Sequence, residues 1–175
     1  TVIGPKNLVV EGVTDFWVLS AMSEHFADKG LVSLANDLTI TPVGGAQKVQ
    51  YMVALLTAEE QKVLVLLDQE KESEVTRDDL VKSKLIDERS VLFMTEAFEA
   101  EPPKEADLED LLDPEIYEAA VRESYAKELV GKELKPNENI PRIAKRMELA
   151  LRQLGIEFHK TRPTRLLLNK MKSDP

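Results

Sequence analysis

Four acidic residues occupy positions from which they could bind a metal ion together. Glu11 and Asp68 each come directly after a run of aliphatic residues, Asp15 follows Glu11 by four positions, and Glu70 follows Asp68 by two. In an open parallel α/β sheet, ligands bind beyond the carboxyl ends of the strands. The four carboxylates are therefore expected to converge at one sheet edge, where their mutual repulsion favours binding of a cation.

The available donor atoms indicate which metals such a site would bind. The chain has no Cys and only two His, His25 and His159, so thiolate and multiple-histidine metal sites are excluded. Carboxylate oxygens favour Mg²⁺ or Mn²⁺, and two such ions about 4 Å apart commonly cleave phosphodiester bonds. Taken alone, an acid at a helix start such as Asp15 is more often a cap or a partner of the helix dipole, because anions are favoured at helix N-termini.

Short apolar runs separated by helical stretches predict the elements that place these acids. Strands are predicted at 8–10, 38–41, 63–67 and 90–94, and this spacing is typical of βαβ units. The intervening helices are predicted from Thr14 to about residue 29, through Val49, Val53 and Leu56, and from Val75 to Ile86. The sequence thus predicts an α/β fold with a mainly parallel sheet flanked by helices.

The second half of the chain is predicted to be mainly helical. Helical periodicity covers residues 116–130 and again 141–154. We predict three regions: an α/β core at 1–112, a helical insertion or extension at 113–155, and a basic segment at 156–175 that returns to the active site.

Charge narrows the possible partners. The 175 residues include 23 Lys and Arg against 32 Asp and Glu, a net charge of -9, which argues against a protein that coats nucleic acid. The charge is uneven, because acidic residues dominate 96–118 whereas 159–172 contains basic residues and no acidic one. With no run long enough to span a bilayer and no secretory signal pattern, we expect a cytoplasmic protein without a membrane partner.

The acidic pattern resembles that of the toprim domain, which occurs in primases, topoisomerases and some nucleases. Glu11-Gly12-Val13-Thr14-Asp15 matches its Glu-Gly-x-x-Asp motif, and Asp68-Gln69-Glu70 matches its Asp-x-Asp motif with Glu in the last position. Gly44-Gly45 lies where toprim domains have a glycine turn. The resemblance implies a Rossmann-like toprim fold that binds Mg²⁺ or Mn²⁺.

Within that superfamily the chain most resembles the nuclease region of an OLD (overcoming lysogenization defect) protein of class 2. The resemblance implies that Glu109, in Leu108-Glu109-Asp110, is a further metal ligand and that Lys160 is the catalytic lysine, with Arg162 and Arg165 binding DNA phosphates. A solvated acidic helix start at Glu109 and a plain basic surface run at Lys160 are the alternatives. Because no Gly-x-x-x-x-Gly-Lys motif is present, the resemblance also implies an N-terminal ABC-type ATPase region missing from this chain, a helicase-like partner and a full-length homodimer.

Together with the acidic pattern, the resemblance predicts a DNA endonuclease or nickase, and a role in phage defence is implied by the family alone. Two Mg²⁺ or Mn²⁺ ions would be held by the five acids, Glu11 could instead serve as general base, and Lys160 would neutralise charge in the transition state. One alternative is a toprim ribonuclease, although the Thr-Asp-Pro-Asp-x-Pro-Gly segment of that family is absent around Asp68. The other is a non-catalytic interaction module stabilised by metal.

Overall fold

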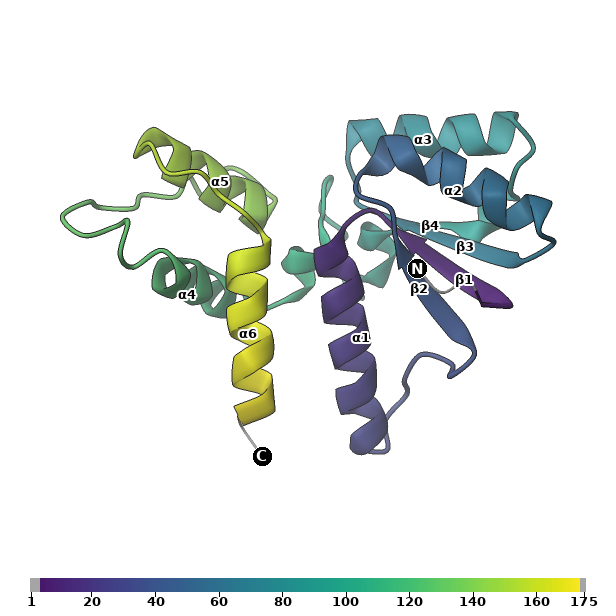
Figure 1. Ribbon diagram of the computed structural model, residues 1–175. Coiled ribbons are helices and arrows are strands. Elements are labelled where there is room, and N and C mark those ends of the chain that lie inside the picture. The colour runs from purple at the N-terminus through teal and green to yellow at the C-terminus, as the bar shows by residue number, and fades with distance from the viewer. Residues whose placement is uncertain (1–3, 174–175) are drawn as a thin grey trace. The chain divides into compact units, whose positions relative to one another are not determined.

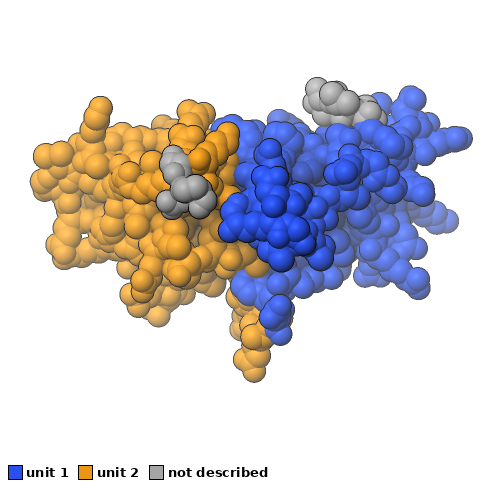
Figure 2. Space-filling view, turned by 90° about the horizontal axis from the view of Figure 1, so that it is seen from below, with its two compact units in different colours: residues 1–99 blue, residues 100–175 orange. Residues whose placement is uncertain are grey.

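The computed structural model describes residues 4–173. Residues 1–3, the first of the predicted core, and residues 174–175, the last of the predicted basic segment, lie outside the described residues. The chain divides into two compact units, residues 1–99 and residues 100–175 (Figure 2). Each unit is described by itself.

The first unit is a four-stranded parallel sheet with helices on both faces (Figure 1). Its strands run in the spatial order β2-β1-β3-β4: β1 (Lys6–Val10), β2 (Leu38–Pro42), β3 (Lys62–Leu67) and β4 (Val91–Phe93). Its helices are α1 (Val13–Asp28), α2 (Ala46–Ala58) and α3 (Lys71–Lys82), with short 3-10 turns η1 (Glu88–Ser90) and η2 (Met94–Ala97). Helices α2 and α3 cover one face of the sheet, and α1 covers the other. The predicted α/β fold class is confirmed.

The core of this unit explains why β1 and β3 are its central strands. Val9 and Val65 are fully buried and pack with Val49 and Leu56 of α2 in one apolar cluster. Central parallel strands are typically formed by continuous apolar runs. The sequence provides such runs at 8–10, where all three residues are buried, and at 63–67, where Leu64 remains 40% exposed.

The third helix begins and ends four residues earlier than the predicted range 75–86. Glu70 is the N-cap of α3, and Lys84 adopts a φ of 55°, which the helix cannot accommodate. The start is charged and polar, with Ser73 buried in the first turn, so apolar periodicity did not mark it.

The second unit is helical and has its own core. It contains η3 (Leu108–Leu111), α4 (Pro114–Ser124), α5 (Ile143–Gln153) and α6 (Thr161–Ser173). Tyr117 and Tyr125 are fully buried and pack with Met147 and Leu151 of α5. Helix α4 ends before the predicted limit of residue 130, and α6 was not predicted at all.

Most of the predicted basic segment, 156–175, forms the helix α6. Pro163 lies in its first turn, where a missing N–H costs nothing, and Leu167 packs against the core of the second unit. The division at residues 99 and 100 also differs from the predicted end of the core at residue 112, since η3 packs with α5.

Candidate functional site

Glu11 is fixed at the carboxyl end of β1 by bonds from three directions. Its side chain is buried, and Oε1 accepts hydrogen bonds from the main-chain N–H of Asp68 (2.9 Å) and from Oγ of Ser73 (2.8 Å). Its carbonyl oxygen accepts from the N–H groups of Gly44 and Gly45, at 2.8 Å each. Both glycines have positive φ, which explains why the turn before α2 requires them. The position of Glu11 therefore depends on β1, β3, α3 and the glycine turn together.

Asp15 lies in the first turn of α1 and is buried. Its Oδ2 accepts a hydrogen bond of 2.7 Å from the N–H of Gly12, the N-cap residue. Asp15 thus serves as a helix-capping residue, as the alternative interpretation expected. This bond also fixes the Asp15 carboxylate at the start of α1, close to Glu11 in the chain. This position is compatible with the predicted metal-binding role of Asp15.

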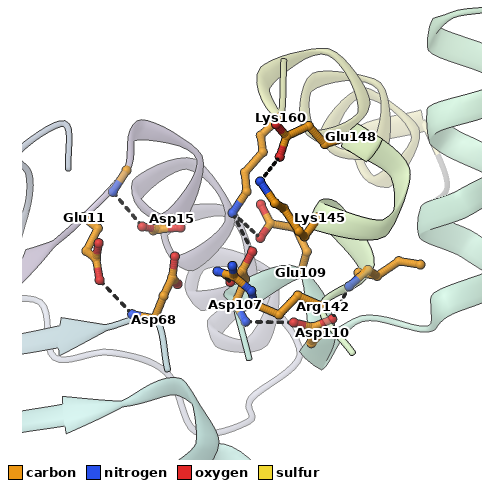
Figure 3. Close-up of polar contacts among 12 residues, drawn as sticks. Glu11, Asp15, Asp68, Asp107, Glu109, Asp110, Arg142, Lys145, Glu148 and Lys160 are labelled. Atoms are coloured by element: carbon orange, nitrogen blue, oxygen red, sulfur yellow. Dashed lines mark hydrogen bonds and ion pairs between the residues drawn. The ribbon is translucent and has the colours of Figure 1, made fainter. Parts of the chain in front are cut away.

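Three of the predicted acids of the first unit lie near the carboxyl ends of β1 and β3. Val10 pairs with Leu66 in the parallel register, so β1 and β3 end level with each other. Figure 3 shows the side chains of Glu11, Asp15 and Asp68 pointing toward one another at these strand ends. Glu70, the N-cap residue of α3, is half-buried and does not cap the helix with its side chain.

A second group of charged side chains lies within the second unit. The Nζ atom of Lys160 is 3.0 Å from Oδ2 of Asp107 and 3.0 Å from Oε2 of Glu109 (Figure 3). Both carboxylates are almost fully buried, with 3% of each side chain exposed, whereas Lys160 is 34% exposed. The predicted pair Glu109 and Lys160 therefore meets across 51 residues of sequence.

Asp107 was not predicted as a site residue, and neither were Arg142 and Asp110, which also belong to this group. Arg142 Nη1 is 3.0 Å from Oδ1 of Asp107. Asp110 accepts hydrogen bonds from the main-chain N–H groups of Ile143 (2.7 Å) and Asp107 (2.8 Å). Burial raises the pKa of the Asp110 carboxyl, against the lowering effect of these two N–H donors. These contacts bind η3 to the start of α5.

The sequence offered little signal for these partners. Asp107 stood within an acidic stretch in which no single residue was distinguished by type. Arg142 lies 35 positions from Asp107, in a segment where the sequence pattern predicted only the start of a helix. A contact over that distance depends on how α5 packs, which residue type and spacing do not specify.

The side chain of Arg162 packs against other residues of the second unit. Its Nη1 is 2.6 Å from Oε1 of Glu128, its Nη2 donates to the carbonyl oxygen of Ser124, and its guanidinium carbon is 3.9 Å from the ring centre of Tyr125. The hydrogen bond to Glu128 raises the pKa of Arg162 and lowers that of Glu128. Through these contacts Arg162 helps to hold the second unit together. Phosphate binding by Arg162 and by the exposed Arg165 stays a prediction.

Tyr117, close to the charged group, has a buried hydroxyl whose effect on stability can be tested. Its ring is fully buried, its hydroxyl has no hydrogen-bond partner among the described residues, and burial together with the negative charge of Glu109 raises its pKa. A buried polar group without a partner costs about 1–3 kcal/mol. We therefore expect Tyr117→Phe to keep or raise the melting temperature, as measured by calorimetry. A loss of more than about 1 kcal/mol would contradict this.

The donor atoms at the carboxyl ends of β1 and β3 suit a hard divalent cation. Glu11, Asp15 and Asp68 supply carboxylate oxygens, which are the ligands that Mg²⁺ and Mn²⁺ prefer. Across residues 4–173, however, no three Asp, Glu or His side chains are already gathered as a metal site. The role of these carboxylates as metal ligands therefore stays a prediction.

Comparison with known families found one similarity, which lies within the first unit. Residues 5–69 match the family described as overcoming lysogenization defect protein-like, TOPRIM domain. This segment is therefore similar to an OLD-like TOPRIM domain. The match confirms the predicted resemblance and includes Glu11, Asp15 and Asp68, although it covers less than half of the chain.

The similarity to TOPRIM domains suggests an activity on nucleic acids. TOPRIM domains are typically found in enzymes that act on nucleic acids, and they generally bind divalent metal ions. Comparison with curated proteins and with solved structures gave no match. None of the helices in the described part of the chain is long and apolar enough to cross a membrane.

Proposed function

We propose that this chain is the nuclease region of an ATPase-nuclease protein and that it hydrolyses phosphodiester bonds in DNA. The observation that carries the proposal is the meeting of Glu11, Asp15 and Asp68 at the ends of two adjacent parallel strands, inside the OLD-like TOPRIM domain. Such an edge is where open α/β sheets bind their ligands. The ATPase region, a helicase-like partner and a homodimer belong to the same proposal.

Each residue has a defined part in this proposal. Glu11, Asp15 and Asp68, with Glu70 and Glu109, would bind Mg²⁺ or Mn²⁺. Bound divalent ions activate water and stabilise the leaving oxygen in phosphodiester hydrolysis. The bonds from Asp68 and Ser73 hold the Glu11 carboxylate in one orientation before substrate arrives. Lys160 would place its positive charge on the scissile phosphate.

Cleavage of supercoiled plasmid with and without Mn²⁺ tests the proposal. We expect metal-dependent nicked or linear product from the parent protein and none from Asp68→Ala. A matched RNA substrate is included, because cleavage of RNA without cleavage of DNA would show a ribonuclease instead. Intact plasmid and intact RNA, with metal binding preserved, would indicate the non-catalytic module and contradict the proposal.

DNA binding by this chain is expected to be weak and strongly dependent on salt. The net charge is -9, and in the described residues Lys160 and Arg162 are already paired with carboxylates. Affinity that comes from the remaining Lys and Arg falls as counterions compete for the phosphates. Fluorescence anisotropy at 50 and 200 mM salt measures this effect. Nanomolar binding that does not change with salt would contradict the expectation.

A further inference from the structure

The carboxylate of Asp107 lies between two cations within the second unit. Oδ1 meets Arg142 at 3.0 Å, and Oδ2 meets Lys160 at 3.0 Å. Only 3% of the Asp107 side chain and 15% of the Arg142 side chain are exposed. A charge-assisted contact on each oxygen therefore fixes the orientation of this carboxylate.

The main chain around Asp107 is fixed as well. Its N–H donates to Oδ2 of Asp110, whose Oδ1 accepts from the N–H of Ile143 at the start of α5. Lys160 lies just before α6, and its carbonyl oxygen accepts from the N–H and the hydroxyl of Thr164. The two partners are thus anchored on separate elements and joined through their side chains.

The two carboxylates that hold Lys160 are in different electrostatic situations. Asp107 also faces the guanidinium of Arg142, which keeps its charge at any ordinary pH. A divalent cation arriving at Asp107 would meet this fixed positive charge as well as Lys160. Glu109 meets Lys160 through Oε2 and is the better placed of the two to exchange the ammonium for a metal ion.

We propose that Asp107 is a positioning residue that holds the ammonium group of Lys160 beside Glu109. Arg142 fixes Asp107 from the opposite side, and Glu109 is the metal ligand of the pair. The proposal rests on the nuclease function given above and adds the residue that orients its lysine. Asp107 acts through Lys160 and touches neither DNA nor metal.

The mobility of the Lys160 side chain tests the positioning directly. Relaxation of the ¹³Cε methylene group gives an order parameter for each lysine, and the exposed Lys127 serves as the internal reference. We expect a higher order parameter for Lys160 than for Lys127 in the parent, falling to the Lys127 level in Asp107→Asn. Glu105→Gln is the matched control, because Glu105 pairs with Arg142 (3.4 Å) and should leave Lys160 ordered.

Two results of this measurement would overturn the proposal. One is an unchanged order parameter for Lys160 in Asp107→Asn. The other needs no variant and covers the case in which Asp107→Asn does not fold: it is a Lys160 side chain as mobile as Lys127 in the parent protein.

Metal affinity separates a positioning residue from a ligand. In calorimetric titration with Mg²⁺, Asp107→Asn should bind within about twofold of the parent, whereas Glu109→Gln should lose roughly 10-fold. An equal loss in the two variants would make Asp107 a ligand and overturn the proposal.

Turnover shows whether Asp107 acts through Lys160. We expect Asp107→Asn to lower kcat roughly 10-fold with KM near the parental value. The double variant Asp107→Asn/Lys160→Ala should be no slower than Lys160→Ala alone, because residues that act as a unit are not additive. Fully additive losses would overturn the proposal.

Failure of the proposed function would give a different pattern. A parent protein that neither binds Mg²⁺ nor cleaves DNA would contradict the nuclease. Loss of Lys160 order in Asp107→Asn would still support the positioning contact in that case.

Discussion

Lys160→Ala is expected to lower the single-turnover rate of DNA cleavage by roughly 100-fold or more, which is the scale seen when one preorganised donor is removed. The ammonium is held 3.0 Å from two buried carboxylates, so its position does not have to be established during the reaction. Metal affinity should not weaken, because an ammonium that competes for Glu109 has been removed. Rapid-quench cleavage at saturating DNA measures the rate, and calorimetry measures the affinity.

Two comparisons separate this role from a simple DNA contact. A phosphate contact would lose affinity by a modest factor, and its turnover would return to the parental value at saturating DNA. Lys160→Arg keeps the charge but changes its shape and reach, so a closely placed catalytic ammonium should not tolerate it. Lys145→Gln, in the partly buried pair of Lys145 with Glu148 on α5, is the matched control. Near-parental turnover in Lys160→Ala would remove this residue from the mechanism.

Asp68→Ala is expected to abolish most of the thermal stabilisation that Mg²⁺ or Mn²⁺ gives the parent. A ligand at 100 times its Kd stabilises the folded state by about 2.7 kcal/mol, and removing a shared carboxylate weakens its binding. The contact with Glu11 uses the main-chain N–H of residue 68, so it survives the substitution. The loss can therefore be assigned to the missing carboxylate.

Scanning calorimetry with and without metal measures this effect. Asp79→Ala, an exposed acid on α3, is the matched control and should respond to metal as the parent does. Equal metal affinity in Asp68→Ala and the parent would contradict a site at this sheet edge.

The sequence by itself determined the sheet and the place of its acids. Continuous aliphatic runs at 8–10 and 63–67 are typical of central parallel strands, and the carboxyl ends of parallel strands lie at the same edge of a sheet. Glu11 and Asp68 follow those runs directly, so their meeting depends only on local pattern and strand direction. Gly44 and Gly45 marked the turn for an equally local reason, because both adopt positive φ.

The tertiary structure alone decided how the second unit uses its charges. Lys160 pairs with Asp107 and Glu109, and Arg142 pairs with Asp107, across separations of 35 to 53 residues. Long charged side chains reach any neighbour that packing provides, so their type and spacing leave the partner undetermined. Arg162 is a second example. The basic segment around it predicted a phosphate contact, whereas its guanidinium packs on Tyr125 and pairs with Glu128. Strand pairing follows a repeating backbone geometry that sequence pattern can predict, but ion pairs between separate helices depend on side-chain packing that only the folded unit specifies.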